Sequence, residues 1–126
     1  MGYFYTGFDY KNRKNGYFKI GETGQKYLSQ RLQVIQHYDS FECLGYLILK
    51  NETLSERRLV ESYVRVMMER VDGLAQTQND HYTYVISGDK YEQAHKYAEI
   101  ALSYAAAFCE QLGIEYERGT KKYKRK

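Results

Sequence analysis

Two aromatic segments on either side of a polar turn constrain the fold of this chain more than any other feature. Tyr3–Phe8 and Tyr17–Gly21 each alternate in side-chain direction, and Asp9–Gly16 between them is polar and contains an Asn-Gly pair. Such alternation is typical of β-strands, and Asn-Gly favours hairpin turns. The pattern predicts a hairpin with Tyr5 and Lys19 on one accessible face. The opposite face would hold the core side chains Phe4, Phe8, Phe18 and Ile20.

The remaining periodic segments predict an α+β fold. We expect a small three-stranded sheet flanked by helices, with the third strand in Ser40–Lys50, and a further strand-like run in Tyr82–Ser87. Helical spacing of apolar residues predicts a helix at about 26–38 and another at about 53–71, which Thr53 would cap with Glu56. A long C-terminal amphipathic helix is expected at Lys90–Leu112, before Gly113.

Length and composition indicate one small folded protein. With 126 residues, 43% of them hydrophobic, the chain can form a single core. We expect residues 1–88 to form the main domain, 89–117 to form a helix packed on it, and 118–126 to form a basic flexible tail. No apolar run approaches the roughly 20 residues that span a bilayer, and no secretion signal is recognisable. The expected location is the cytoplasm, the nucleoid or the nucleus, without membrane association.

Basic residues are concentrated at the two ends of the chain. Residues 1–38 contain six basic and two acidic residues, 39–117 contain seven and fourteen, and 118–126 contain six and none. This distribution suits a polyanion that approaches one face, since Lys and Arg contacts to phosphate release counterions. A solubilising tail is the alternative for the last segment. The expected nucleic-acid contacts are Lys11, Arg13, Lys14, Lys26, Lys121, Lys122, Lys124 and Arg125.

An ordered set of motifs suggests what these elements do. Gly2–Tyr5 begins the first strand, Lys19–Gly21 ends the second, Arg31 lies at the edge of the first helix's apolar stripe, and Glu61 flanks the stripe of the next. In this order and on these elements, the motifs resemble those of the GIY-YIG nuclease superfamily over about residues 2–70. The resemblance is to a branch with Lys-Ile-Gly as the second motif. Tyr17 is then the only tyrosine that could replace the missing one.

The resemblance implies a Mg²⁺-dependent (or Mn²⁺-dependent) endonuclease that hydrolyses DNA phosphodiester bonds. Glu61 would hold the metal, Arg31 and Lys19 would contact phosphate oxygens, and Tyr5 would orient or deprotonate the attacking water. Because free tyrosine has a pKa of about 10, a nearby cation must lower it for efficient base catalysis. Gly21 would let the backbone approach the substrate closely. The secondary candidates are Tyr17, His37 and Asn79.

Two hypotheses from other classes stay open. The first is a catalytically silent nucleic-acid-binding module of the same fold, which uses Arg31, Lys19 and the tail for phosphates only. The second is an interaction protein in which the alanine-rich face of the helix at Lys90–Leu112 binds a partner protein or forms a homodimer.

Overall fold

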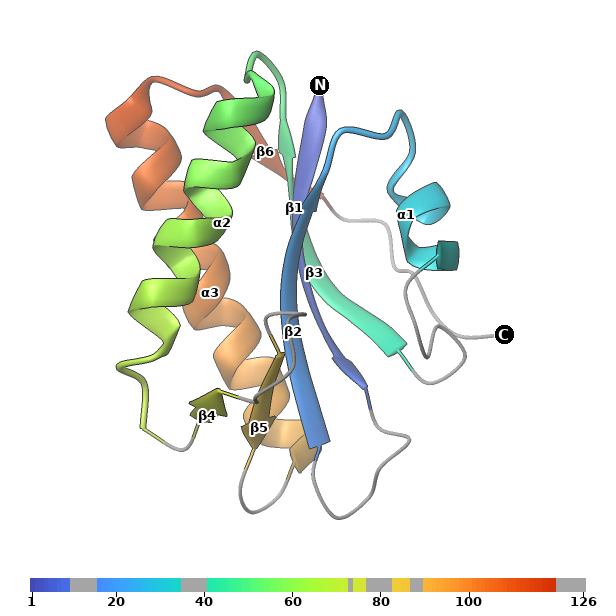
Figure 1. Ribbon diagram of the computed structural model, residues 1–126, viewed down its shortest axis with the longest axis vertical. Coiled ribbons are helices and arrows are strands. Elements are labelled where there is room, and N and C mark those ends of the chain that lie inside the picture. The colour runs from blue at the N-terminus through green and yellow to red at the C-terminus, as the bar shows by residue number, and fades with distance from the viewer. Residues whose placement is uncertain (10–15, 35–40, 73, 77–82, 87–89, 120–126) are drawn as a thin grey trace.

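The α+β architecture predicted from the sequence is confirmed. The computed structural model describes residues 1–9, 16–34, 41–72, 74–76, 83–86 and 90–119, and Figure 1 shows one sheet with helices on both faces. The elements are β1 (Gly2–Asp9), β2 (Gly16–Thr23), α1 (Leu28–Val34), β3 (Phe41–Leu49), α2 (Leu54–Met68), β4 (Leu74–Gln76), β5 (Thr83–Ile86), α3 (Lys90–Leu112) and β6 (Tyr116–Arg118).

The sheet is larger than the three strands that we predicted. Its order is β4-β5-β2-β1-β3-β6, and every neighbouring pair is antiparallel. The three long strands β2, β1 and β3 are those expected from the alternation, and the strand-like run near residue 84 joins them as β5. Of the added strands, β4 and β6 are only three residues long, too short for an alternating pattern to identify them. β5 covers part of the edge of β2, and β6 covers part of the edge of β3.

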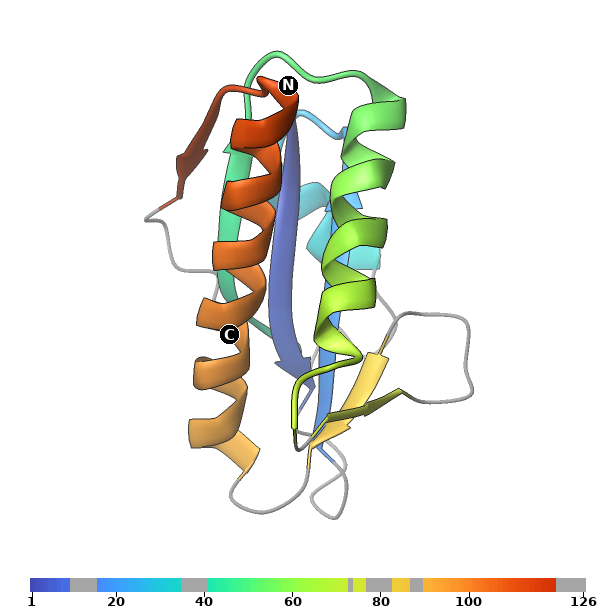
Figure 2. The same ribbon diagram turned by 90° about the vertical axis from the view of Figure 1, so that its left-hand side faces the viewer.

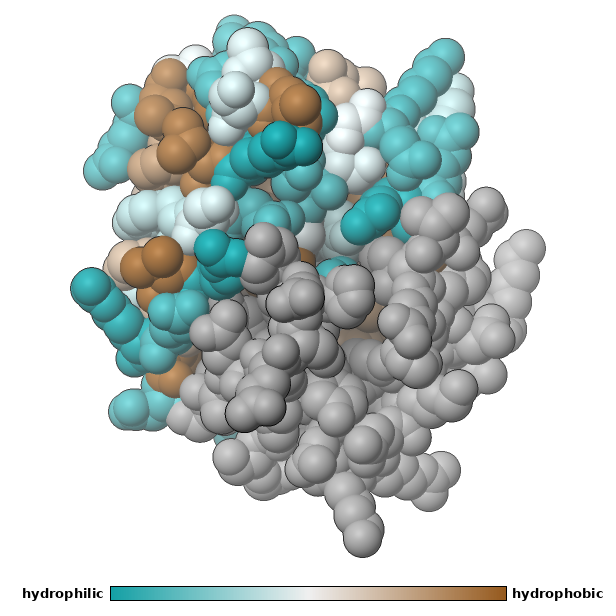
Figure 3. All heavy atoms as spheres, in the orientation of Figure 1, coloured by the Kyte–Doolittle hydropathy of each residue, from teal (hydrophilic) through white to brown (hydrophobic). Residues whose placement is uncertain are grey.

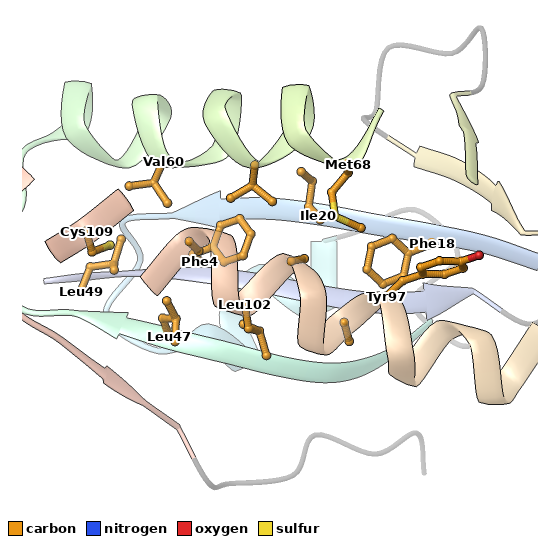
Figure 4. Packing of buried hydrophobic residues seen from close by; sticks show 14 of the residues in the cluster. Phe4, Phe18, Ile20, Leu47, Leu49, Val60, Met68, Tyr97, Leu102 and Cys109 are labelled. Carbon is orange, nitrogen blue, oxygen red and sulfur yellow. The ribbon is translucent and has the colours of Figure 1, made fainter. Parts of the chain in front are cut away.

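The main core lies between the sheet and the helices α2 and α3, which run side by side over one face (Figure 2). The predicted core side of the hairpin is confirmed, because Phe4, Phe18 and Ile20 are fully buried there. Figure 4 shows these side chains facing residues of α2 and α3 such as Val60 and Leu102. The alternation therefore determines which face of the hairpin the two long helices cover.

The helix boundaries follow their capping signals. Thr53 and Glu56 form the predicted capping box at the start of α2, with hydrogen bonds of 3.2 and 2.8 Å between side chain and backbone. The helix ends at Met68, three residues before the predicted end near residue 71. The predicted bounds of α3 are confirmed, and Gly113 follows with a φ of 72°, which a glycine adopts without steric cost.

The alanine-rich face of α3 does not form an interaction surface, contrary to one of our hypotheses. Ala94, Ala101 and Ala105 are fully buried in the core of the same chain. Small side chains let the helix lie close to the sheet, which leaves this face no area for a partner protein.

The opposite face of the sheet carries a second, smaller core under α1. It consists of Tyr3, Tyr5, Leu28, Leu32, Phe41 and Tyr46. The helix is shorter than predicted, Leu28–Val34 within the expected 26–38, and residues 35–40 lie outside the described part. Tyr5 has no exposed surface, so our prediction of an accessible Tyr5 is wrong. The reason is that α1 and the aromatic side chains of β3 cover this half of the sheet.

The segment after α3 also differs from the prediction. Arg118, which we placed in the basic tail, belongs to β6 and binds the carboxylate of Glu99 through Nη1 at 2.8 Å. Residues 120–126 lie outside the described residues. Among the helices that the structure describes, none is both long enough and apolar enough to cross a bilayer.

Candidate active site at the edge of strand β2

The candidate site lies at the end of β2 beyond its paired segment with β5. β5 pairs only with Gly16–Lys19, so among the described strands none covers residues 20–23 on that side. α2 passes along this open edge, and the Glu61 carboxylate hydrogen-bonds to the backbone of Glu22. A strand edge presents unpaired N–H groups, which a carboxylate can accept from. Glu61 therefore lies at the rim of the sheet and not over the middle of the core.

The four residues that we predicted as catalytic come together at this edge. Tyr5 is paired with Gly21 and Lys19 with Gly7, which places both side chains on the α1 face of the sheet. Arg31 of α1 donates from Nε to the Tyr5 hydroxyl at 3.3 Å. The charge of Glu61 acts on Tyr5 and on Lys19, so the carboxylate is near both although α2 lies on the other face. Glu61 of α2 thus interacts electrostatically with two side chains that lie on the α1 face of the sheet.

Tyr5 is a poorer base than we expected. Burial raises its pKa above the ordinary value, and the Arg31 hydrogen bond and charge only partly oppose this, while Glu61 adds to it. Base catalysis requires a nearby cation to lower this pKa, and among the described residues the guanidinium of Arg31 does not suffice, because desolvation outweighs it. In the protein without a metal, Tyr5 holds its proton and anchors Arg31.

Lys19 and Glu61 are both partly buried, and their pKa values move toward neutrality. Burial lowers the pKa of Lys19 to about 8, with Glu61 opposing and Arg31 reinforcing the change. Burial also raises the pKa of Glu61 to about 6. Glu22 adds to that rise, and Lys19 opposes it. Perturbed values of this kind, caused by desolvation and by specific neighbouring charges, are characteristic of functional sites.

An ion-pair network that we did not predict lies next to the site and consists of Arg57, Glu22 and Glu52. Arg57 donates from Nε to Glu22 at 3.0 Å and from Nη1 to Glu52 at 2.8 Å. In the sequence, Arg57 stands four residues before Glu61, one helical turn away. The sequence signal for this network was the spacing of four residues between Arg57 and Glu61, which places both on one face of α2. From that face, Arg57 contacts the side chain of Glu22 and Glu61 contacts its backbone.

Gly21 makes room for the Tyr5 ring. A Cβ atom at this position would lie 2.4 Å from the Tyr5 hydroxyl oxygen and 2.5 Å from Tyr5 Cζ. The missing side chain is therefore a packing requirement of the site.

Gly21→Ala is therefore expected to displace Tyr5 and to lower the free energy of unfolding by about 1–3 kcal/mol, the usual cost of overpacking. Chemical denaturation measures the effect. The control is the same change in a Tyr5→Leu background, where the penalty should shrink because the clashing ring is gone. An equal penalty in both backgrounds would show that the ring does not set the requirement for glycine.

The other predicted contacts are only partly described. Lys26 is exposed before α1, and its carbonyl accepts a 2.9 Å hydrogen bond from Tyr3. Tyr17 pairs with Asp9 in the sheet, but its side chain lies outside the description. The remaining candidates lie outside the described residues: His37, Asn79, Lys11, Arg13, Lys14, Lys121, Lys122, Lys124 and Arg125.

Of the carboxylates at the site, Glu61 suits Mg²⁺ as a single protein ligand. No group of three or more His, Cys, Asp or Glu side chains is assembled within the described ranges. Mg²⁺ needs only one or two carboxylates when water and substrate phosphates complete its shell. Glu61 meets that requirement because it is partly exposed, whereas Glu22 is paired with Arg57.

An open pocket adjoins the cluster. It has a volume of about 340 Å³ and is lined by Glu22, Thr23, Gly24, Gln25, Arg31, Leu54 and Arg57. Comparisons of the chain with protein-family models, with curated proteins and with solved structures found no match.

Proposed function

We propose that this protein is a Mg²⁺-dependent (or Mn²⁺-dependent) endonuclease of the GIY-YIG type that hydrolyses phosphodiester bonds in DNA. One observation carries the proposal. Tyr5, Lys19, Arg31 and Glu61 come from β1, β2, α1 and α2, far apart in the sequence, and meet at one edge of the sheet. A purely structural role would not explain why two cations, a carboxylate and a phenol share a partly desolvated site.

Each side chain has a task that its surroundings support. Arg31 is held through Nε, and within the described ranges no hydrogen bond engages its two terminal nitrogens, which suit the non-bridging oxygens of a phosphate. Lys19 supplies a second positive charge, and at neutral pH its pKa of about 8 keeps it mostly protonated. Tyr5, which has no exposed surface, fixes the orientation of Arg31 by accepting the hydrogen bond from its Nε.

Glu61 is the residue that would hold the metal. Its carboxylate hydrogen-bonds to the backbone of Glu22, which fixes its orientation and leaves lone pairs for a cation. A bound Mg²⁺ would supply Lewis-acid stabilisation of the phosphate and of the attacking oxygen. The nearby Lys19 and Arg31 would complement it by offsetting the charge of the phosphate.

The second candidate is the catalytically silent nucleic-acid-binding module. The burial of Tyr5 and the raised pKa of its phenol favour it, because a tyrosine that keeps its proton cannot act as a base. In that case Arg31 and Lys19 would contact phosphates without cleavage.

Relaxation of supercoiled plasmid with Mg²⁺, and its loss with EDTA, tests the proposal. Glu61→Gln should remove cleavage, and Arg31→Ala should reduce it by about 10²–10³-fold, the usual cost of losing one donor to a developing charge. The matched controls are Glu69→Gln and Arg58→Ala, which remove the same charges at exposed positions, one directly after α2 and one within it. Cleavage by Glu61→Gln at the native rate would refute the proposed site. Metal-independent binding without any product would favour the silent module.

A further inference from the structure

The pocket beside the catalytic cluster has no role in the proposed chemistry itself. Its walls come from the end of β2 (Glu22 and Thr23), the following turn, Arg31 of α1 and the first turn of α2. These segments lie together at the upper end of the molecule in Figure 1. Arg31 belongs to both the pocket and the cluster, because it lines the pocket and donates to Tyr5. A nucleic-acid strand that Arg31 binds at the reacting centre would therefore continue directly into the pocket.

The shape of the pocket depends on a guanidinium that is held in place. The Glu22 and Glu52 carboxylates bind Arg57 through Nε and Nη1, and Nη2 points to Gly24. A Cβ atom on Gly24 would lie 2.4 Å from Nη2, so the glycine leaves this donor room. The Arg57 guanidinium that lines the pocket is therefore fixed in orientation before any ligand binds.

The lining combines donors with one apolar surface. Two guanidiniums and one carboxylate line the pocket. Arg57 is shared between the Glu22 and Glu52 carboxylates, so Arg31 is the lining cation that lies outside this network. Leu54 adds an aliphatic side chain with 48% of its surface exposed. The volume of about 340 Å³ lies at the lower end of small-ligand pockets. Donors beside an apolar wall suit a phosphate that is joined to a sugar.

From this arrangement we infer that the pocket receives one nucleotide of the bound strand, next to the scissile phosphate. Arg31 stays on the scissile phosphate at the edge of the pocket, Nη2 of Arg57 contacts the phosphate of that nucleotide, and Leu54 packs against its sugar. The inference rests on the proposed function, because it assumes that the cluster binds a phosphodiester strand.

Two leucines of α2 provide a matched test. Leu54 lines the pocket, whereas Leu59 lies outside it with nearly the same exposure, 50% against 48%. Figure 3 shows exposed apolar side chains of this kind on the side where α2 lies. Changing either leucine to glutamate alters the net charge equally, and an acidic residue at the first position of the helix is compatible with its dipole. Arg57 is not varied here because its substitution would disturb the fold.

The measurement is fluorescence anisotropy with a short labelled DNA duplex and the matching single strand. Glu61→Gln serves as the parent, so that no cleavage occurs. Leu54→Glu should weaken binding about tenfold and reduce the salt slope of log Kd by about 1, because the introduced carboxylate lies beside the phosphate and offsets one phosphate contact. Leu59→Glu should change Kd less than about twofold, since exposed charges outside the contact are screened.

Neutral methylphosphonate linkages then locate the contact. At one linkage beside the centre of the bound DNA segment, replacing the phosphate with a methylphosphonate should weaken binding by the parent. The same replacement should not weaken binding by the Leu54→Glu variant. Equal losses from Leu54→Glu and Leu59→Glu, with an unchanged salt slope, would overturn the inference and leave the proposed function standing. A parent that binds neither DNA form would overturn both.

Discussion

Replacing Glu61 with glutamine is expected to stabilise the metal-free protein at pH 8 by about 1–2 kcal/mol while it removes cleavage. The carboxylate lies in a partly desolvated site beside Glu22, and both effects raise its pKa, to about 6. A charged Glu61 is therefore less favourable in the folded protein than in the unfolded chain. Glutamine keeps an acceptor for the hydrogen bond with the Glu22 backbone and removes the charge.

The pH dependence gives this prediction a definite sign. The folded pKa of about 6 exceeds the ordinary value of 4.5, so the folded state binds the proton more tightly. The stability of the native protein relative to Glu61→Gln should rise as the pH falls from 6 to 4.5 and should level off below that. The difference between the two should thus be largest above pH 6 and close to zero at pH 4.

Urea unfolding in EDTA at a series of pH values measures this difference. The control is Glu69→Gln, because Glu69 is exposed at the C-terminal end of α2 and its neutralisation should change the stability little at any of these pH values. A less stable Glu61→Gln variant at pH 8 would mean that the carboxylate is a structural residue.

The second large effect concerns the charged network behind the site. Arg57→Met is expected to lower the free energy of unfolding by about 3–5 kcal/mol, the cost of breaking a buried ion pair from one side. The Glu52 side chain has no exposed surface, and its only hydrogen bond in the described chain comes from Arg57. Removing the guanidinium leaves this carboxylate and that of Glu22 without these donors.

Thermal and chemical denaturation measure the loss at pH 7. Arg58→Met is the control, because Arg58 is exposed at the next position of the same helix. A triple variant with Arg57→Met, Glu22→Gln and Glu52→Gln should recover much of the stability, since buried charges then need no compensation. If Arg57→Met and Arg58→Met cost the same, the network contributes nothing to the fold.

Both predictions concern Glu22, which connects the two sides of the site. Arg57 contacts its side chain and Glu61 its backbone, one turn apart on α2. The same contacts hold α2 against the open edge of β2 and direct Glu61 to the face where Tyr5 and Arg31 meet. Stability and chemistry are therefore expected to be coupled through this short stretch of strand.

Local patterns were sufficient for much of the architecture. The alternation in β1 and β2, the capping box at Thr53 and the glycine after Leu112 each act over a few residues, so these strands, one helix start and one helix end could be predicted locally. Tyr5, Lys19, Arg31 and Glu61 were selected as candidates through the resemblance of the ordered motifs to those of the GIY-YIG superfamily. Neither depends on knowing which distant segments touch.

The tertiary structure alone decided how these residues behave. Tyr5 lies on the non-core face of its strand by alternation, yet α1 and β3 bury it, and that burial raises its pKa. Glu61 of α2 acts on Tyr5 and Lys19 at the part of β2 beyond Lys19, with which no described residue of β5 pairs. Burial and charge interactions depend on contacts between residues far apart in the chain, and no local pattern contains them.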